Sequence, residues 1–320
     1  VGADLIAARP DKVFFTGSVA TGRRVMAAAA QHPIPVSLEL GGVDAMIVCE
    51  DADLELAASA AAWGATFNGG QVCASVERLL VHESVAEHFS LLLADKLERI
   101  DPIEDLGRIT MPRQREVYDR HMADARDRGL DVVLGGSYLD EHHMAPTLVQ
   151  GDGILESRVY REETFGPVVT LAPFASETDA IRLHNDSPYG LTASIFTRSR
   201  SRARGMAAKL RTGLVSVNDI GATLHGHAEI PWGGVGESGF GRSHGEEGLL
   251  EATWSQVIDE SRWNGFEPKR PWWYPYDHRQ MALIDGLTDL VGAECTRSRL
   301  RALARAGKAA LVMATRSPRS

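Results

Sequence analysis

The sequence predicts an α/β protein with a parallel sheet. One observation is a strand–helix–strand unit near the start of the chain: an apolar run over 13–17, an alanine-rich helical pattern over 21–31 and a second strand pattern over 35–40. Another is that helical and strand patterns continue to alternate as far as residue 218. Such alternation is typical of parallel sheets, whose strands are joined by crossover helices.

Each element near the start of the chain has its own signal. Val1–Ala8 has the apolar spacing of an amphipathic helix. Val13–Gly17 reads as a buried strand that ends in a glycine turn. Pro33 and Pro35 end the helix that follows, because proline cannot continue a helix. A glycine pair then separates the second strand from a further strand predicted over 45–49.

The same alternation continues beyond this unit. Apolar residues recur with helical spacing over 53–66, and Asp51 and Asp53 suit the N-terminus of that helix. The elements after it are predicted from shorter patterns. We expect strands at 78–81, 131–134, 168–173, 191–197 and 213–218, and helices at 84–100, 114–128, 175–185 and 200–210.

The sequence changes in character after about residue 255. Proline and aromatic residues cluster in Pro268–Tyr276, and a helix containing Met281 and Leu287 follows. The last 24 residues, 297–320, carry seven lysines and arginines and no acidic residue. The simplest interpretation is a solvated helix with a frayed end. Contact with an anionic surface or with a partner subunit is the alternative.

Composition and charge exclude several classes of protein. The 320 residues carry 43 acidic and 34 basic side chains, a net charge of −9, which argues against nucleic acid as a partner. No uncharged apolar run approaches the ~20 residues that span a bilayer. Three cysteines suit neither a disulfide framework nor a zinc ribbon, so we expect a reducing, cytoplasmic compartment. The histidines, among them His142-His143 and His225-Gly-His227, lack partners at ligand spacing, so no metal site is expected.

The start of the chain predicts that it is a fragment. It opens on Val1, inside the expected first helix, and no charged, apolar and cleavage-site pattern of a secretory signal precedes it.

A cysteine and a glutamate stand in segments suited to catalysis. Cys73 follows a Gly-Gly pair in Phe67–Cys73 and precedes a strand, where backbone N–H groups can approach a substrate closely. Glu39 lies at the C-terminal end of a predicted strand, where α/β sheets place their sites. A cysteine attacks only as thiolate and so needs a base or a positive field. Taken alone, Cys73 reads more simply as a buried structural thiol and Glu39 as a capped or salt-bridged carboxylate.

Further motifs change this interpretation. Arg161–Pro167 contains Glu-Glu-Thr-Phe-Gly-Pro, and Pro231–Arg242 contains Pro-Trp-Gly-Gly and Ser-Gly-Phe-Gly. Together with Phe15–Ser18, Glu39–Gly42 and the cysteine segment, they make five motifs in order, with the cysteine 34 residues after the glutamate. This set resembles the aldehyde dehydrogenase superfamily. Two residues depart from the family pattern: valine replaces the usual lysine after the Glu-Leu-Gly-Gly segment, and tryptophan replaces phenylalanine in Pro-Trp-Gly-Gly.

The resemblance implies a covalent mechanism. Cys73 would attack the aldehyde carbon to give a thiohemiacetal, and loss of a hydride to the nicotinamide would give a thioester. Glu39 would activate the water that hydrolyses the thioester, and it would also be able to take the thiol proton. The backbone N–H of Cys73 would form half of the oxyanion hole, and the other half in this family is an asparagine from an upstream region.

The resemblance also implies a cofactor site for NAD or NADP, and it leaves open which of the two binds. Gly17 and Ser18 would approach the pyrophosphate at a helix N-terminus, and Glu163 would hold the nicotinamide ribose with Phe165 nearby. The full set of cofactor-binding residues is Gly17, Ser18, Gly22, Leu40, Glu163 and Phe165.

The implied fold is a three-layer catalytic domain with the last part of a Rossmann-like cofactor domain. Residues 1–40 would end the cofactor domain, 41–250 would form the catalytic domain and return to the cofactor domain, and 251–320 would be an extension for oligomerisation or surface contact. The family resemblance further implies a homo-oligomer, dimeric or tetrameric.

The expected activity is oxidation of a non-phosphorylated aldehyde to the free acid with NAD(P)+. The retained Glu39 favours hydrolysis over transfer to coenzyme A. The alternative is a truncated, non-catalytic fragment or a structural pseudo-subunit. Mostly apolar candidates for the substrate tunnel favour aliphatic or aryl aldehydes; Trp232 is either a tunnel wall or core. The tunnel candidates are Trp63, Phe67, Val72, Ala74, Leu224 and His225.

Overall fold

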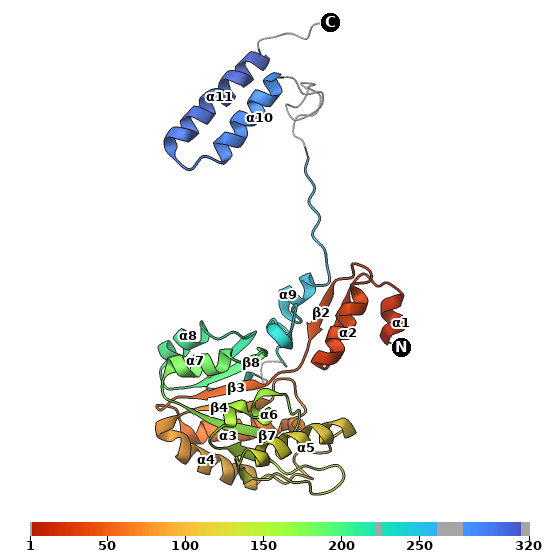
Figure 1. Cartoon of the computed structure of the whole chain (residues 1–320), viewed down its shortest axis with the longest axis vertical. Coiled ribbons are helices and arrows are strands. Elements are labelled where there is room, and N and C mark those ends of the chain that lie inside the picture. The colour runs from red at the N-terminus through yellow and green to blue at the C-terminus, as the bar shows by residue number, and fades with distance from the viewer. Residues whose placement is uncertain (1, 222–225, 261–277, 315–320) are drawn as a thin grey trace. The chain divides into compact units, whose positions relative to one another are not determined.

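The structure is a computed structural model that describes residues 2–221, 226–260 and 278–314 (Figure 1). It divides into two compact units, Val1–Ser255 and Gln256–Ser320. The tunnel candidates Leu224 and His225 and the aromatic cluster Pro268–Tyr276 lie outside the described residues.

A small sheet opens the first unit, and its elements confirm the predicted strand–helix–strand start. The first strand was expected to be buried, but its residues alternate between half-buried and exposed. Helix α1 (Gly2–Ala7) precedes β1 (Val13–Thr16), α2 (Val19–Ala29) and β2 (Val36–Glu39). Strands β1 and β2 are parallel, and β10 (Gly239–Phe240) joins the other side of β2 antiparallel. Helix α2 begins where it does because the Ser18 hydroxyl accepts the Thr21 N–H at 3.4 Å, a standard N-cap.

A sheet of seven strands forms the rest of the first unit. Its spatial order is β5-β6-β7-β4-β3-β8-β9, and all neighbours are parallel except β5 and β6. The strands are β3 (Asp44–Val48), β4 (Val76–His82), β5 (Asp131–Leu134), β6 (Thr147–Gln150), β7 (Val168–Phe174), β8 (Thr192–Phe196) and β9 (Leu214–Val217). The parallel sheet expected from the sequence is therefore present.

Helices cover both faces of this sheet, which gives three layers. Met46 and Val48 of β3 point into one core with α3 and α4, whereas Ala45 and Ile47 point into the other with α5, α7 and α8. Figure 1 shows α7 and α8 across the strands from α3 and α4. These helices are α3 (Leu54–Thr66), α4 (Glu83–Glu98), α5 (Pro112–Asp127), α7 (Glu177–Asn185) and α8 (Arg200–Ala207).

Several short elements were not predicted. Strand β6 and helices α6 (Arg158–Arg161) and α9 (Gly245–Leu250) span only four to six residues, which is too short for a periodic pattern. The 3-10 turns η1 (Phe67–Gly70), η2 (Ile154–Glu156) and η4 (Gly236–Ser238) are shorter still or rich in glycine.

The second unit is a helical hairpin. Helix α10 (His278–Val291) and helix α11 (Thr296–Ala314) pack along one another. A Cβ at Gly286 would lie 2.9 Å from the backbone nitrogen of Ala306, so the two helices approach closely at this point. Within the described ranges, no helix is both long enough and apolar enough to cross a bilayer.

Candidate active site

The motifs predicted from the sequence meet at Gly41-Gly42, between the two sheets. A Cβ at Gly41 would lie 2.2 Å from a carboxylate oxygen of Glu163, and one at Gly42 would lie 2.4 Å from the Cys73 carbonyl oxygen. Only glycine leaves room for both neighbours. The two glycines therefore let Cys73 and Glu163 close around the segment that follows Glu39.

The cysteine loop has an unusual backbone. Asn68, Gly69 and Gly70 have φ values of 56°, 66° and 72°, so three successive residues are left-handed. This reversal turns the chain out of α3 and toward β4. A Cβ at Gly70 would lie 2.0 Å from the carbonyl oxygen of Gly166, so the loop rests directly on the Phe-Gly-Pro motif.

Cys73 is partly buried just before the amino end of β4. It packs against a small apolar cluster that contains Ala74 and Trp232. Trp232 is therefore a core residue that also lies beside Cys73. Burial raises the pKa of the Cys73 thiol to about 12, and the negative charges of Asp44, Glu163 and Glu39 add to the rise. The thiol is therefore protonated at neutral pH and needs a base before it can attack.

Glu39 ends strand β2, as the sequence predicts. A Cβ at Gly233 would lie 3.0 Å from its Oε1 atom, so the Pro-Trp-Gly-Gly motif closes over this carboxylate. Burial raises the pKa of Glu39 to about 7, against the lowering effect of the Arg242 guanidinium. A carboxylate with such a pKa can accept and release a proton near neutral pH.

Glu163 reaches the same glycine pair from the other side. Its Oε1 accepts the Gly42 N–H at 3.1 Å. Burial raises the pKa of Glu163 to about 7, partly offset by that hydrogen bond. Among the described residues this is the one hydrogen bond recorded for its carboxylate, which leaves acceptor capacity for the hydroxyls of a ligand.

Glu77 is a site residue that the sequence reasoning missed. It is 1% exposed within β4, and its carboxylate accepts the N–H groups of Thr164 at 2.8 Å and of Phe165 at 3.0 Å. Phe165 has a φ of 52°, a strained value for a bulky residue, so these two bonds hold its loop in place. The adjacent charged pair Glu77-Arg78 at the start of a strand pattern is the signal that could have found it.

Asp44 was also missed. It starts β3, is 3% exposed, and accepts the Thr192 hydroxyl at 2.6 Å and the Thr192 N–H at 3.1 Å. Burial raises the pKa of Asp44 to about 7, although both of these bonds favour the charged form. Its carboxylate adds to the negative field at Cys73.

The predicted cofactor residues of the first motif lie around the start of α2. The Gly17 N–H donates to the Glu39 carbonyl at 3.0 Å, which ties this turn to the end of β2. Ser18 is exposed at the helix N-cap. A Cβ at Gly22 would lie 2.6 Å from a Leu40 methyl group, so Gly22 lets Leu40 pack against α2.

Two of the predicted tunnel residues, Trp63 and Phe67, stack with ring centroids 4.7 Å apart, and they are 42% and 50% exposed. In the part of the chain that the structure describes, no group of three or more His, Cys, Asp or Glu side chains could hold a metal ion.

Comparison with known proteins agrees with this arrangement. The model of the aldehyde dehydrogenase family matches residues 1–258, which is most of the chain. The chain belongs to the aldehyde dehydrogenase family. Its described strands and helices give the three-layer α/β fold expected of that family.

Two relatives illustrate the match. This family member is 43% identical over 299 residues to the 4,4'-diapolycopene aldehyde oxidase of Methylomonas sp, covering 92% of this chain and 55% of that protein. It is 37% identical over 273 residues to the peroxisomal aminoaldehyde dehydrogenase 2 of Pisum sativum, covering 81% and 53%.

A solved structure is similar as well. The betaine aldehyde dehydrogenase of Staphylococcus aureus in complex with NAD+ aligns with a TM-score of 0.71 and 36% identity, over 75% of this chain and 49% of that one. The chain thus spans about half the length of the curated relatives and solved chains it matches.

Proposed function

We propose that this chain carries the catalytic part of an NAD(P)-dependent aldehyde dehydrogenase that oxidises an aldehyde to the free carboxylic acid. The observation that supports it is the convergence of Cys73, Glu39 and Glu163 on the Gly41-Gly42 segment. A partly buried thiol faces carboxylates whose pKa values lie near neutrality. This pairing suits proton transfer and covalent catalysis.

The first half of the reaction uses Cys73 as nucleophile. Glu39, as carboxylate, takes the thiol proton, and the sulfur forms a bond to the aldehyde carbon while the carbonyl π electrons move to oxygen. A nicotinamide cofactor held by Glu163, Gly17 and Ser18 would supply the acceptor for the hydride that leaves that carbon. The C=O bond then reforms, which leaves a thioester on Cys73.

The second half releases the acid. Glu39 first releases the thiol proton to solvent; it then accepts a proton from water while the water oxygen attacks the thioester carbon. The C–S bond breaks, and its electron pair returns to Cys73 as thiolate. A pKa near 7 allows Glu39 to take up and release a proton in each turnover.

The residues present fit a bound dinucleotide. Glu163 has free acceptor capacity for ribose hydroxyls, and Gly17 and Ser18 expose the N-terminus of α2, where unpaired N–H groups favour a pyrophosphate. Leu40 packs against Gly22 beside this helix N-terminus, and Phe165 follows Glu163 by two residues; we assign both to the cofactor site. We assign the role of cofactor to NAD or NADP.

The domain division follows from the same reading. Residues 1–40 end the cofactor domain, 41–250 form the catalytic domain and return, and 251–320 are an extension. Pairing of β10 with β2 supports the return, because Gly239–Phe240 rejoins the small sheet after the chain has built the large one.

The substrate class is an aliphatic or aryl aldehyde. Cys73 packs against the apolar cluster that contains Ala74 and Trp232, and Val72 contacts the same cluster. The name of the Methylomonas relative supports the same class, since diapolycopene is a hydrocarbon polyene.

Two wider properties belong to the proposal. Three free cysteines suit the cytoplasm, where thiols stay reduced. Exposed apolar side chains near residue 250 suit self-association into a dimer or tetramer; they are Leu249, Leu250, Trp254, Val257 and Ile258.

The test is a rapid-mixing measurement of NAD(P)H formation from hexanal and benzaldehyde. The proteins are the 320-residue chain and any longer chain that its gene encodes. Whichever of these chains catalyses repeated NAD(P)H formation is compared with its Glu39→Gln variant. We expect the variant to give a burst of up to one NAD(P)H per site and then to turn over ~10²–10⁴-fold more slowly, with a thioester visible as added mass.

Hydroxylamine should partly restore turnover in that variant, because it replaces the activated water. If the burst itself disappears and returns at high pH, Glu39 acts chiefly on the thiol. Unchanged steady-state turnover would remove both roles of Glu39. No NAD(P)H from any form would favour the non-catalytic alternative.

A further inference from the structure

The part of the chain that contains the helical hairpin carries the opposite charge from the rest. Residues 278–320 hold eight basic and three acidic side chains, a net charge of +5, which leaves −14 on residues 1–277. Five of the eight basic residues stand within helix α11. In a protein that is acidic overall but ends in a basic helix, the helix attracts anions while the rest of the chain repels them.

One face of α11 is fully used by the hairpin. Small residues recur at every third or fourth position and are buried or half-buried against α10: Ser298, Ala302, Ala306 and Ala309. The close approach at Gly286 requires such small side chains. Residues elsewhere around α11 therefore do not contribute to the hairpin core.

A second face of α11 is apolar and exposed. Leu300, Leu303 and Leu311 are 62%, 52% and 66% exposed. With Gly307 between them they recur at intervals of three and four residues, so they share one side of the helix. We call these four residues the leucine strip. A row of exposed leucines is costly in water and needs an apolar surface to cover it.

A third face of α11 is basic. Arg297, Arg301, Arg305 and Lys308 recur at intervals of four, four and three, and all four are exposed. We call these residues the basic stripe. By helical spacing this stripe lies between the leucine strip and the buried alanines, on one flank of the helix.

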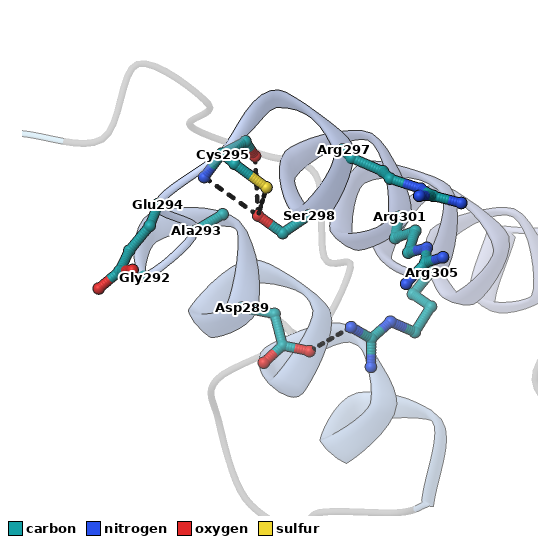
Figure 2. A pocket seen from close by; sticks show the side chains of 9 residues that line it. All are labelled: Asp289, Gly292, Ala293, Glu294, Cys295, Arg297, Ser298, Arg301 and Arg305. Atoms are coloured by element: carbon teal, nitrogen blue, oxygen red, sulfur yellow. Dashed lines mark hydrogen bonds and ion pairs between the residues drawn. The ribbon is translucent and has the colours of Figure 1, made fainter.

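The arginines of the basic stripe line a hollow of about 500 Å³ where α10 ends and α11 begins. Figure 2 shows Arg297, Arg301 and Arg305 projecting from α11, with Asp289 of α10 below them. Arg305 pairs with Asp289 at 2.7 Å. Within the described part of the hairpin no other ion pair is recorded for this stripe, although Glu294 also borders the hollow.

We propose that α11 binds in the plane of an anionic membrane surface. The leucine strip would enter the acyl boundary, and the neighbouring basic stripe would contact lipid phosphates; this is the arrangement of interfacial helices. Residues 1–277, with a net charge of −14, are repelled by an anionic bilayer. The attraction to such a bilayer therefore comes from the positive charge of the hairpin. With five basic residues along its length, α11 lies on the bilayer and does not cross it.

The test is flotation of the full chain with vesicles of phosphatidylcholine containing about one third phosphatidylglycerol, and with vesicles of phosphatidylcholine alone. We expect binding to the anionic vesicles, much weaker binding to the neutral ones, and loss of binding in high salt. Arg297→Gln/Arg301→Gln should weaken binding about thirtyfold, and Leu300→Ser/Leu303→Ser should also weaken it severely.

Matched controls lie in the first unit. Arg200→Gln/Arg204→Gln removes two exposed charges from α8, and Leu91→Ser removes a leucine of α4 that is 64% exposed. Neither should weaken vesicle binding. Circular dichroism checks that the hairpin variants keep their helix content.

Three results would overturn the proposal: no binding to either vesicle, equal binding to both, or equal losses in the control variants. A fourth is a hairpin variant that changes the oligomeric state on a sizing column while vesicle binding is unaltered, because the leucine strip would then be covered by a second copy. None of these results depends on whether the chain oxidises aldehydes.

Discussion

Charged side chains are paired differently at the two ends of the strands in the seven-stranded sheet. We call these ends the carboxyl edge and the amino edge of the sheet. At the carboxyl edge, Arg202 binds both oxygens of Glu50 at 2.9 Å, Asp51 at 3.2 Å and Glu177 at 2.7 Å. The hydrogen bond from Arg202 holds the pKa of Glu50 below its usual value. Every acid of this cluster has a cation.

The amino edge of the same sheet, together with Glu39 at the end of β2 in the small sheet, gathers carboxylates that are not paired in this way. Glu39, Asp44 and Glu163 have pKa values raised to about 7, and burial raises the pKa of Glu77 well above its usual value. Several buried acids side by side lower stability, and structures keep such an arrangement mainly where it serves chemistry. In α/β sheets the carboxyl edge is the usual place for ligands, yet here the charge arrangement singles out the amino edge.

The two edges each have a cysteine, which allows the largest predicted effect to be measured with an internal control. Cys49 follows β3 at the carboxyl edge and is fully buried, and burial raises the pKa of its thiol to about 12, as for Cys73. Cys73→Ala should lower kcat on the order of 10⁴-fold or more, because the nucleophile is lost. Cys49→Ala should keep kcat per folded molecule within about threefold.

Steady-state NAD(P)H formation, normalised to folded protein by circular dichroism, measures both variants. A comparable loss in the two variants would contradict the assignment of chemistry to the amino edge.

A smaller effect concerns Arg242, the cation near Glu39 at the amino edge. Arg242 lowers the pKa of Glu39, so Arg242→Gln should raise that pKa further above neutrality. With Glu39 as the base of the proposed mechanism, the acid limb of the kcat/KM–pH profile should move to higher pH by up to about one unit. Arg242→Lys should leave the limb near its original position, since the charge remains.

Arg202→Gln is the matching change at the carboxyl edge and should not move the limb. An acid limb that stays fixed in Arg242→Gln would show that another group sets the pH dependence.

The smallest predicted effect is on stability. The pKa of Asp44 is about 7 in the folded chain and near 3.9 when unfolded. Between these values the folded state holds the proton more firmly, so stability falls as pH rises from about 4 to about 7. Asp44→Asn should therefore reduce the drop in Tm between pH 5 and pH 8, without removing it, because Glu39 and Glu163 titrate in the same direction.

Thermal unfolding at the two pH values measures this difference. Glu50→Gln should leave the difference unchanged, because the pKa of Glu50 is lowered and it titrates below pH 5. A larger drop in Asp44→Asn than in the parent chain would refute the sign of the argument.

The amino-acid sequence predicted those parts of the site that depend on local pattern. Glu39 and Cys73 stand in motifs with glycines at fixed offsets, and strands such as β3 and β7 consist mostly of apolar residues. Glu77 and Asp44 could not be placed, because their roles arise from partners 87 and 148 residues away in the chain. Strand β6 could not be predicted for a related reason. Its four residues are held by pairing with β5 and β7, and they are too few to show a periodic sequence pattern of their own.

The glycine contacts set limits for protein engineering. Replacing glycine by alanine commonly raises stability by about 0.4–1 kcal/mol where the backbone allows it, through a less flexible unfolded chain. Alanine does not fit at Gly41, Gly42 and Gly70, where its methyl group would collide with a carboxylate or a carbonyl. Alanine fits at Gly205 in α8, where the added Cβ would meet nothing within 4 Å. Substitutions that raise the thermal stability of this protein should therefore be sought on the outer helices, with the segment between the two sheets left unchanged.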